Sequence, residues 1–130
     1  MMSDADTSRR SVLGGAAFGL AAAAAPGAAI AQAAGAPAGA PIVLLDHQPA
    51  QAARAASRGV ALQLSGHTHG GMIRGLDRLV ARGNAGFVSG AYRVGAMLLY
   101  VSNGTGLWPG FALRLGRSSE LTRITLRTSS

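Results

Sequence analysis

The chain has 130 residues, which is enough for one small domain. Its twelve basic residues, all arginine, outnumber five acidic ones and give a net charge of +7. Such an excess favours anionic partners such as phosphate esters, nucleic acids or acidic membrane surfaces, although biased base composition explains an all-arginine set equally well. The sequence contains no cysteine, which excludes disulfides and thiolate metal sites, so a metal would need nitrogen and oxygen ligands.

Residues 1–31 have the layout of an export signal. Arg9 and Arg10 precede an apolar run over 12–25, and Ala29-Ile30-Ala31 offers a cleavage site. The run is short for a membrane span, which needs about twenty residues. The order SRRSVL at 8–13 resembles a twin-arginine signal, which implies an exported, periplasmic or cell-envelope protein. An uncleaved anchor and a soluble alanine-rich helix stay open as alternatives, and a full-length chain confined to the cytoplasm would contradict export.

Residues 32–40, rich in alanine, glycine and proline, predict a flexible linker. Residues 41–64 then predict a strand, a helix and a second strand. The first strand, PIVLL at 41–45, is short and rich in β-branched residues. The helix, 49–59, starts with proline and ends at glycine, and VALQL at 60–64 supplies the second strand. Because a right-handed crossover makes the two strands parallel, their carboxyl ends meet at one edge of the sheet.

All three histidines of the chain follow these two strands. His47 comes just after the first, and His67 and His69 lie in GHTHGG after the second, so we expect them to converge on one spot. In an extended segment the side chains of residues 67 and 69 point to the same side. The neighbouring glycines allow the positive φ angles that a loop around an ion commonly needs. Ordinary polar loop residues are the alternative, but the placement of all three favours a metal site.

The remainder predicts scaffold around this edge. Residues 75–83 predict a short helix, near which Arg74, Arg78 and Arg82 are more typical of a solvated face than of a phosphate clamp.

Strands are expected over 87–94 and 97–102, joined at Gly95, and further strands over 113–115 and 121–126. Trp108, just beyond a glycine-rich loop, is expected to pack over that loop rather than to bind substrate.

Four segments together resemble the carboxyl-terminal half of a calcineurin-like metallophosphoesterase: IVLLDHQP, LQLSGHTHGG, GAYRVGAMLLYVSNGTGLWPGFALRLG and ELTRITLR. The resemblance covers residues 41–127 and implies an α/β fold, half of a two-sheet sandwich in which a βαβ unit precedes mostly strands. It implies two divalent metal ions of the Mn, Fe or Zn type, and hydrolysis of a small-molecule or lipid phosphoester by a metal-activated hydroxide. His47, His67 and His69 match the histidine ligands of the family's fourth and fifth motifs, which makes them the implied metal ligands.

The earlier motifs of that family, which supply aspartate, asparagine and further histidine, have no counterpart in this sequence. Asp4 and Asp6 lie in the predicted signal, and Asp46 directly precedes His47. A two-metal site needs a bridging carboxylate. We therefore expect a truncated phosphoester hydrolase over 41–127, weak or inactive alone, whose partner is a missing amino-terminal half or a second copy of the chain.

Two other classes of function are alternatives to the hydrolase. The first is a catalytically inactive metal-binding or interaction remnant that has kept the histidines. The second is a nucleic-acid binder, against which the sequence argues, because aromatic residues make up only 5% of the chain and do not interleave with the arginines.

Overall fold

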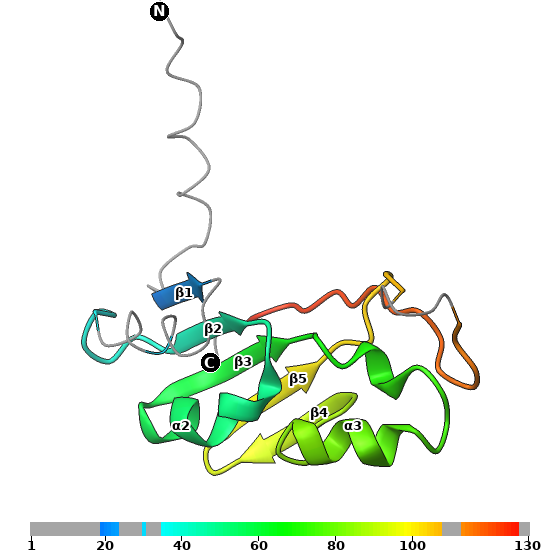
Figure 1. The fold of residues 1–130 in the computed structure, drawn as a ribbon. Coiled ribbons are helices and arrows are strands. Elements are labelled where there is room, and N and C mark those ends of the chain that lie inside the picture. The colour runs from blue at the N-terminus through cyan, green and yellow to red at the C-terminus, as the bar shows by residue number, and fades with distance from the viewer. Residues whose placement is uncertain (1–18, 24–29, 31–34, 108–112, 128–130) are drawn as a thin grey trace, which may run out of the picture.

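The computed structural model describes residues 19–23, 30, 35–107 and 113–127. It contains a five-stranded sheet in the order β1-β2-β3-β5-β4, in which β4 is antiparallel to β5 and the other neighbours are parallel (Figure 1). The strands are β1 (Gly19–Ala23), β2 (Ile42–Asp46), β3 (Val60–Ser65), β4 (Gly90–Val94) and β5 (Met97–Val101). The short helices are η1 (Pro49–Gln51), α2 (Ala52–Ser57), η2 (His69–Gly71) and α3 (Asp77–Gly83). The predicted α/β fold class is confirmed.

The βαβ unit forms as its residues predict. Pro49 occupies the start of η1, where its missing N–H costs no helical hydrogen bond. Gly59 ends the helical segment with φ +77°, a conformation that few other residues adopt readily. Ala52 and Ala55 are fully buried, and their small side chains let α2 lie close to the sheet.

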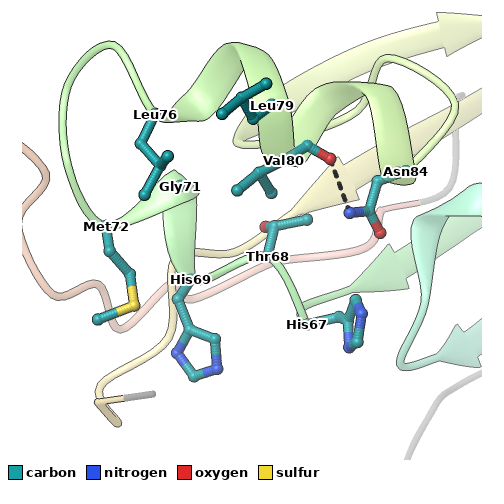
Figure 2. A pocket seen from close by; sticks show the side chains of 10 residues that line it. His67, Thr68, His69, Gly71, Met72, Leu76, Leu79, Val80 and Asn84 are labelled. Atoms are coloured by element: carbon teal, nitrogen blue, oxygen red, sulfur yellow. Dashed lines mark hydrogen bonds between the residues drawn. The ribbon is translucent and has the colours of Figure 1, made fainter. Parts of the chain in front are cut away.

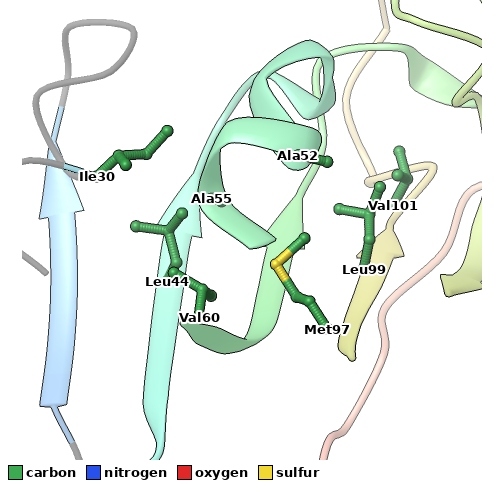
Figure 3. Close-up of a cluster of buried hydrophobic side chains, with 8 residues drawn as sticks. All are labelled: Ile30, Leu44, Ala52, Ala55, Val60, Met97, Leu99 and Val101. Atoms are coloured by element: carbon green, nitrogen blue, oxygen red, sulfur yellow. The ribbon is translucent and has the colours of Figure 1, made fainter. Parts of the chain in front are cut away.

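The core lies between α2 and one face of the sheet. Figure 3 shows Leu44 of β2, Val60 of β3 and three side chains of β5 gathered under the two buried alanines, with Ile30 beside them near β1. The β5 side chains, Met97, Leu99 and Val101, are completely buried. The alternation of inward and outward side chains on β5 thus follows the strand period of two.

The hairpin β4–β5 turns at Gly95, as predicted, with φ +59°. Its first strand is shorter than the predicted 87–94. The Tyr92 hydroxyl accepts the backbone N–H groups of Val88 and Ser89, and the Phe87 ring packs edge-on against Tyr92 with the ring centroids 5.0 Å apart. These contacts satisfy the backbone without a neighbouring strand, so residues 87–89 approach β4 as a turn.

The predicted strands at 113–115 and 121–126 are wrong. Leu115 forms a single isolated bridge with Ile73, and no residue over 121–127 is in a strand. A strand needs a free sheet edge, and here the segment crosses the face opposite α2 instead, where Leu121 and Ile124 line a cavity of about 350 Å³ with Leu64 and Tyr100. The carboxyl-terminal segment, 113–127, therefore covers part of a sheet face without extending the sheet.

Part of the predicted signal lies in the sheet. Gly19–Ala23 forms the edge strand β1 beside β2, and Ile30 is buried in the core. No helix in the parts of the chain that the structure describes is long and apolar enough to cross a membrane. Arg9 and Arg10 fall outside the described residues, and export stays a prediction from the sequence.

Candidate functional site

Two of the three histidines stand together at the carboxyl edge of the sheet. His47 follows β2 and His67 follows β3, and the loops that carry them are joined by a hydrogen bond from the Gly66 N–H to the His47 carbonyl oxygen, 3.1 Å. The imidazole rings meet edge to face, with their centroids 5.1 Å apart and their planes at 82°. The crossover between adjacent parallel strands thus brings together two side chains twenty positions apart in the sequence.

The loop that carries His67 and His69 is not extended, contrary to the assumption made from the sequence. His67 and His69 have φ angles of +70° and +50°, and Met72 has +56°. Left-handed backbone at residues other than glycine costs about 1–3 kcal/mol each and is concentrated at functional sites. Thr68, between the histidines, is buried and donates its hydroxyl to the Val88 carbonyl oxygen at 2.5 Å, while both rings are directed away from α3 (Figure 2).

Glycine is required at two positions of this loop. A Cβ atom on Gly70 would lie 2.3 Å from Oδ1 of Asn103, and one on Gly71 would lie 2.6 Å from the Asp77 Cα. Both glycines also have positive φ. The loop therefore packs closely against Asn103, just after β5, and against the start of α3. This packing holds His69 in place at the sheet edge.

His69 is held by a separate contact. Its Nδ1 lies 3.2 Å from the carbonyl oxygen of Gly106, in the glycine-rich loop after β5. Arg114 donates one guanidinium nitrogen to that same carbonyl at 2.6 Å and the other to the carbonyl of His69 itself at 3.2 Å. Three segments far apart in the sequence therefore meet at His69.

The electrostatic environment favours neutral imidazole at this edge. The pKa of His67 is lowered from its usual 6.5 by partial loss of hydration, and further by the neighbouring charges of His47 and His69. A metal binds the neutral form of histidine, so a lowered pKa keeps the lone pair available at neutral pH.

Carboxylates are scarce around the histidines. Asp46 is buried, and one of its oxygens accepts the Gln48 N–H at 3.2 Å while the other has no partner among the described residues. Asp77 pairs with Arg117, and Glu120 accepts from Tyr100, Thr122 and Asn103. In the described parts of the chain, no group of three or more His, Cys, Asp or Glu side chains is arranged to hold a metal ion. The histidines fit a borderline ion such as zinc as part of its ligand set, not as the whole of it.

A cavity of about 400 Å³ opens beside the histidines (Figure 2). His67, His69 and Met72 line one side of it, and α3 lines another through Leu79 and Val80. Arg74, Arg78 and Arg82 are exposed and are not among the residues that line the cavity, as expected of a solvated face. Trp108 lies outside the described residues.

Three residues that support this site were not predicted from the sequence: Asn103, Arg114 and Glu120. Each lies in a segment predicted as loop or strand, and its role depends on contacts with residues 10 to 45 positions away. The only hint in the sequence is that Glu120 is one of five acidic residues in a strongly basic chain.

Comparison with known proteins identifies relatives of the chain. No protein-family model matches it, and no solved structure is significantly similar to it. A transmembrane protein with a metallophosphoesterase domain from Danio rerio is 41% identical over 90 residues, which cover 67% of this chain and 20% of that protein. An uncharacterized metallophosphoesterase of Campylobacter jejuni is 43% identical over 86 residues, 65% of this chain and 22% of that protein.

A third relative, an uncharacterized metallophosphoesterase of Bacillus subtilis, is 35% identical over 92 residues, 68% of this chain and 32% of that protein. The chain thus spans between a fifth and a third of the length of these relatives. Their similarity supports assignment of the chain to the metallophosphoesterases, a family whose name implies the use of metal ions.

Proposed function

We propose that the chain forms part of a metal-dependent phosphoester hydrolase and supplies nitrogen ligands through His47, His67 and His69. The observation that carries the proposal is the meeting of His47 and His67 at the carboxyl edge of two parallel strands, the usual place for ligands in open α/β sheets. The relatives named metallophosphoesterase support the reaction class.

A divalent metal would supply a Lewis acid and a water molecule activated near neutral pH. The residues of the chain would hold and orient it. His47 and His67 offer imidazole nitrogens, and the lowered pKa of His67, caused first by burial, favours its neutral form. The strained loop sets the direction of the His67 ring. His69 lies two residues farther along, with its position fixed by Gly106 and Arg114.

The cavity beside the histidines supports a substrate whose organic group is apolar. Much of its lining is hydrocarbon, from Met72, Leu76, Leu79 and Val80. Binding sites for small molecules are typically apolar with a few placed polar groups. The phosphate would lie at the histidines and the aryl or acyl group in the cavity.

The other candidate is a metal-binding module without hydrolytic activity. It is favoured by the shortage of free carboxylates near the histidines within the described residues. Three imidazoles bring no negative charge to offset a cation, and a two-metal reaction needs a bridging carboxylate.

A metal titration combined with a hydrolysis assay distinguishes the two. The full chain is titrated with zinc and with manganese, and turnover of an activated aryl phosphate is measured for wild type, His67→Ala, His69→Ala and the exposed control Arg82→Ala. We expect zinc to bind wild type and the control with modest affinity, and each histidine variant about tenfold or more weakly. Turnover should be slow, metal-dependent and lost in both histidine variants.

Each outcome has a separate meaning. Zinc binding that is unchanged in His67→Ala and His69→Ala would show that the ligands are misassigned. Zinc binding without turnover in wild type would establish the inactive module. If Leu79→Gln raises KM for the aryl phosphate but not for glycerol phosphate, the cavity holds the organic group; equal effects on both would place that group elsewhere.

A further inference from the structure

Arg114 makes an unusual set of contacts for a residue in an irregular segment. Within the described residues its guanidinium donates hydrogen bonds only to backbone carbonyl oxygens, which come from three places: the histidine loop, the loop after β5, and its own segment. The acceptors are the carbonyls of His69 at 3.2 Å, Asn103 at 3.0 Å, Gly104 at 3.3 Å, Gly106 at 2.6 Å and Ser118 at 3.5 Å. The side chain thus ties these loops together.

The Gly106 carbonyl is shared between Arg114 and the His69 ring. A carbonyl oxygen can only accept hydrogen bonds, and it lies 3.2 Å from Nδ1 of His69. Nδ1 must therefore carry the hydrogen, because an unprotonated nitrogen would direct its lone pair at the lone pairs of the oxygen. In a neutral ring this leaves the Nε2 lone pair free.

We propose that Arg114 is a positioning residue that holds Gly106 against His69 and thereby locks His69 in the Nδ1–H tautomer, with Nε2 as the ligand atom. The use of Nε2 for a metal rests on the proposed function, whereas the tautomer does not. Backbone carbonyls that accept from the second nitrogen of a histidine fix ring orientation and tautomer in many metal sites. Here the cation of Arg114, 8 residues farther along the chain, holds the Gly106 carbonyl in place.

The geometry requires arginine in particular. A guanidinium holds its two terminal nitrogens apart in one plane, so each can donate to a different loop. Nη1 donates to the carbonyls of His69 and Ser118, and Nη2 lies within reach of those of Asn103, Gly104 and Gly106, while the buried Nε has no partner among the described residues. A lysine ammonium has three donors on one atom and cannot reach both the His69 and the Gly106 carbonyls with comparable geometry. Arg114→Lys therefore keeps the positive charge but no longer holds the Gly106 carbonyl against His69.

Nuclear magnetic resonance reads the tautomer directly. Long-range ¹H–¹⁵N correlation of the imidazoles is recorded on the full metal-free chain at pH 8, for wild type, Arg114→Lys and Arg114→Gln. Arg117→Gln is the matched control, because Arg117 lies in the same segment but pairs with Asp77 and not with the histidine loop. We expect His69 as Nδ1–H in wild type and in the control, and a mixture rich in Nε2–H in both Arg114 variants, with the His67 signals unchanged.

Zinc affinity provides the second measurement. Arg114→Gln should weaken zinc binding about tenfold or more, and should add no further loss in the His69→Ala background. Nε2–H at His69 in wild type, or an Nδ1–H tautomer that survives Arg114→Gln in the folded chain, would overturn the proposal. If Arg114→Gln does not fold, the His69 tautomers of wild type and of Arg114→Lys still test the proposal. Wild type that binds no zinc, with Nδ1–H at His69, would refute the proposed function and leave the positioning role intact.

Discussion

The histidine loop concentrates backbone strain at the proposed ligand residues. His67, His69 and Met72 have left-handed φ angles, and two glycines between them could not hold a Cβ atom without a clash. Such a conformation persists only where surrounding contacts over-determine it. Here the Thr68 hydroxyl donates a hydrogen bond to the Val88 carbonyl, and Arg114 of the carboxyl-terminal segment donates one to the His69 carbonyl.

Gly71 should therefore tolerate substitution worse than another glycine of the same conformation. Gly71→Ala is compared with Gly75→Ala, because both have positive φ but only Gly71 would bring Cβ within 2.6 Å of backbone atoms. We expect the common cost of left-handed alanine, about 1–2 kcal/mol, in both variants. Overpacking against Asp77 should cost Gly71→Ala about a further 1–3 kcal/mol. Urea unfolding measures the free energy of unfolding of both variants. Equal losses of stability would show that α3 moves freely away from the loop.

Among the elements, the carboxyl-terminal segment acts as a strap and not as a strand. Glu120 anchors it to β5: its carboxylate accepts from the Tyr100 hydroxyl and, at 3.1 Å, from the Asn103 N–H. Burial alone would raise the pKa of Glu120, but hydrogen bonds from Thr122, Tyr100 and Asn103 outweigh it and hold the pKa below the usual 4.5. The same pairing raises the pKa of Tyr100. The strap in turn carries Arg114 to the histidine loop.

The strap should loosen in acid. Because the folded-state pKa of Glu120 is depressed, its contribution to stability is present above about pH 4.5 and is lost as pH falls through the lower folded-state value. Wild type should thus lose stability below pH 4.5 more steeply than Glu120→Gln. Asp77→Asn serves as the control. The hydrogen bond from Arg117 lowers the pKa of Asp77 from a usual value of 3.8, which is itself below the 4.5 of Glu120, so the loss of its contribution begins at a lower pH. If the free energy of unfolding changes with pH in parallel for wild type and Glu120→Gln, Glu120 does not anchor the strap.

As a whole molecule, the chain has one covered and one partly open sheet face. The face toward α2 is closed, whereas on the opposite face Leu45 and Leu98 are 37% and 41% exposed. The strap lies over Leu64 and Tyr100, and its own Leu121 is 93% exposed. A face of this kind is what a second sheet would cover in a two-sheet sandwich.

We expect the full chain to self-associate through this open face. Sedimentation velocity should show dimers or larger species for wild type, shifted toward monomer by Leu98→Glu. Leu79→Glu, which adds the same charge at a leucine of α3 that is 58% exposed, should leave the association unchanged. A monodisperse wild-type monomer with a cooperative unfolding transition would show instead that the strap is a sufficient cover.

The sequence by itself determined most of the local elements and the sheet edge at which His47 and His67 meet. The apolar runs, Pro49, Gly59 and Gly95 encode β2, the helical crossover, β3 and the β4–β5 hairpin through local propensity and turn chemistry, and these elements lie close to their predicted bounds. The parallel pairing of β2 and β3 also followed from the sequence, because a crossover between parallel strands places their carboxyl ends together. The meeting of His47 and His67 rests on that rule.

Only the tertiary structure decided the conformation of the histidine loop and the fate of the carboxyl-terminal segment. The alternating pattern of 121–126 suits a strand, but a strand forms only where a partner edge is free, and that information is not local. The left-handed angles of His67 and His69 likewise depend on the contacts of Asn103, Arg114 and Asp77 with the loop. Such contacts join residues far apart in the chain, so no pattern of neighbouring residues records them.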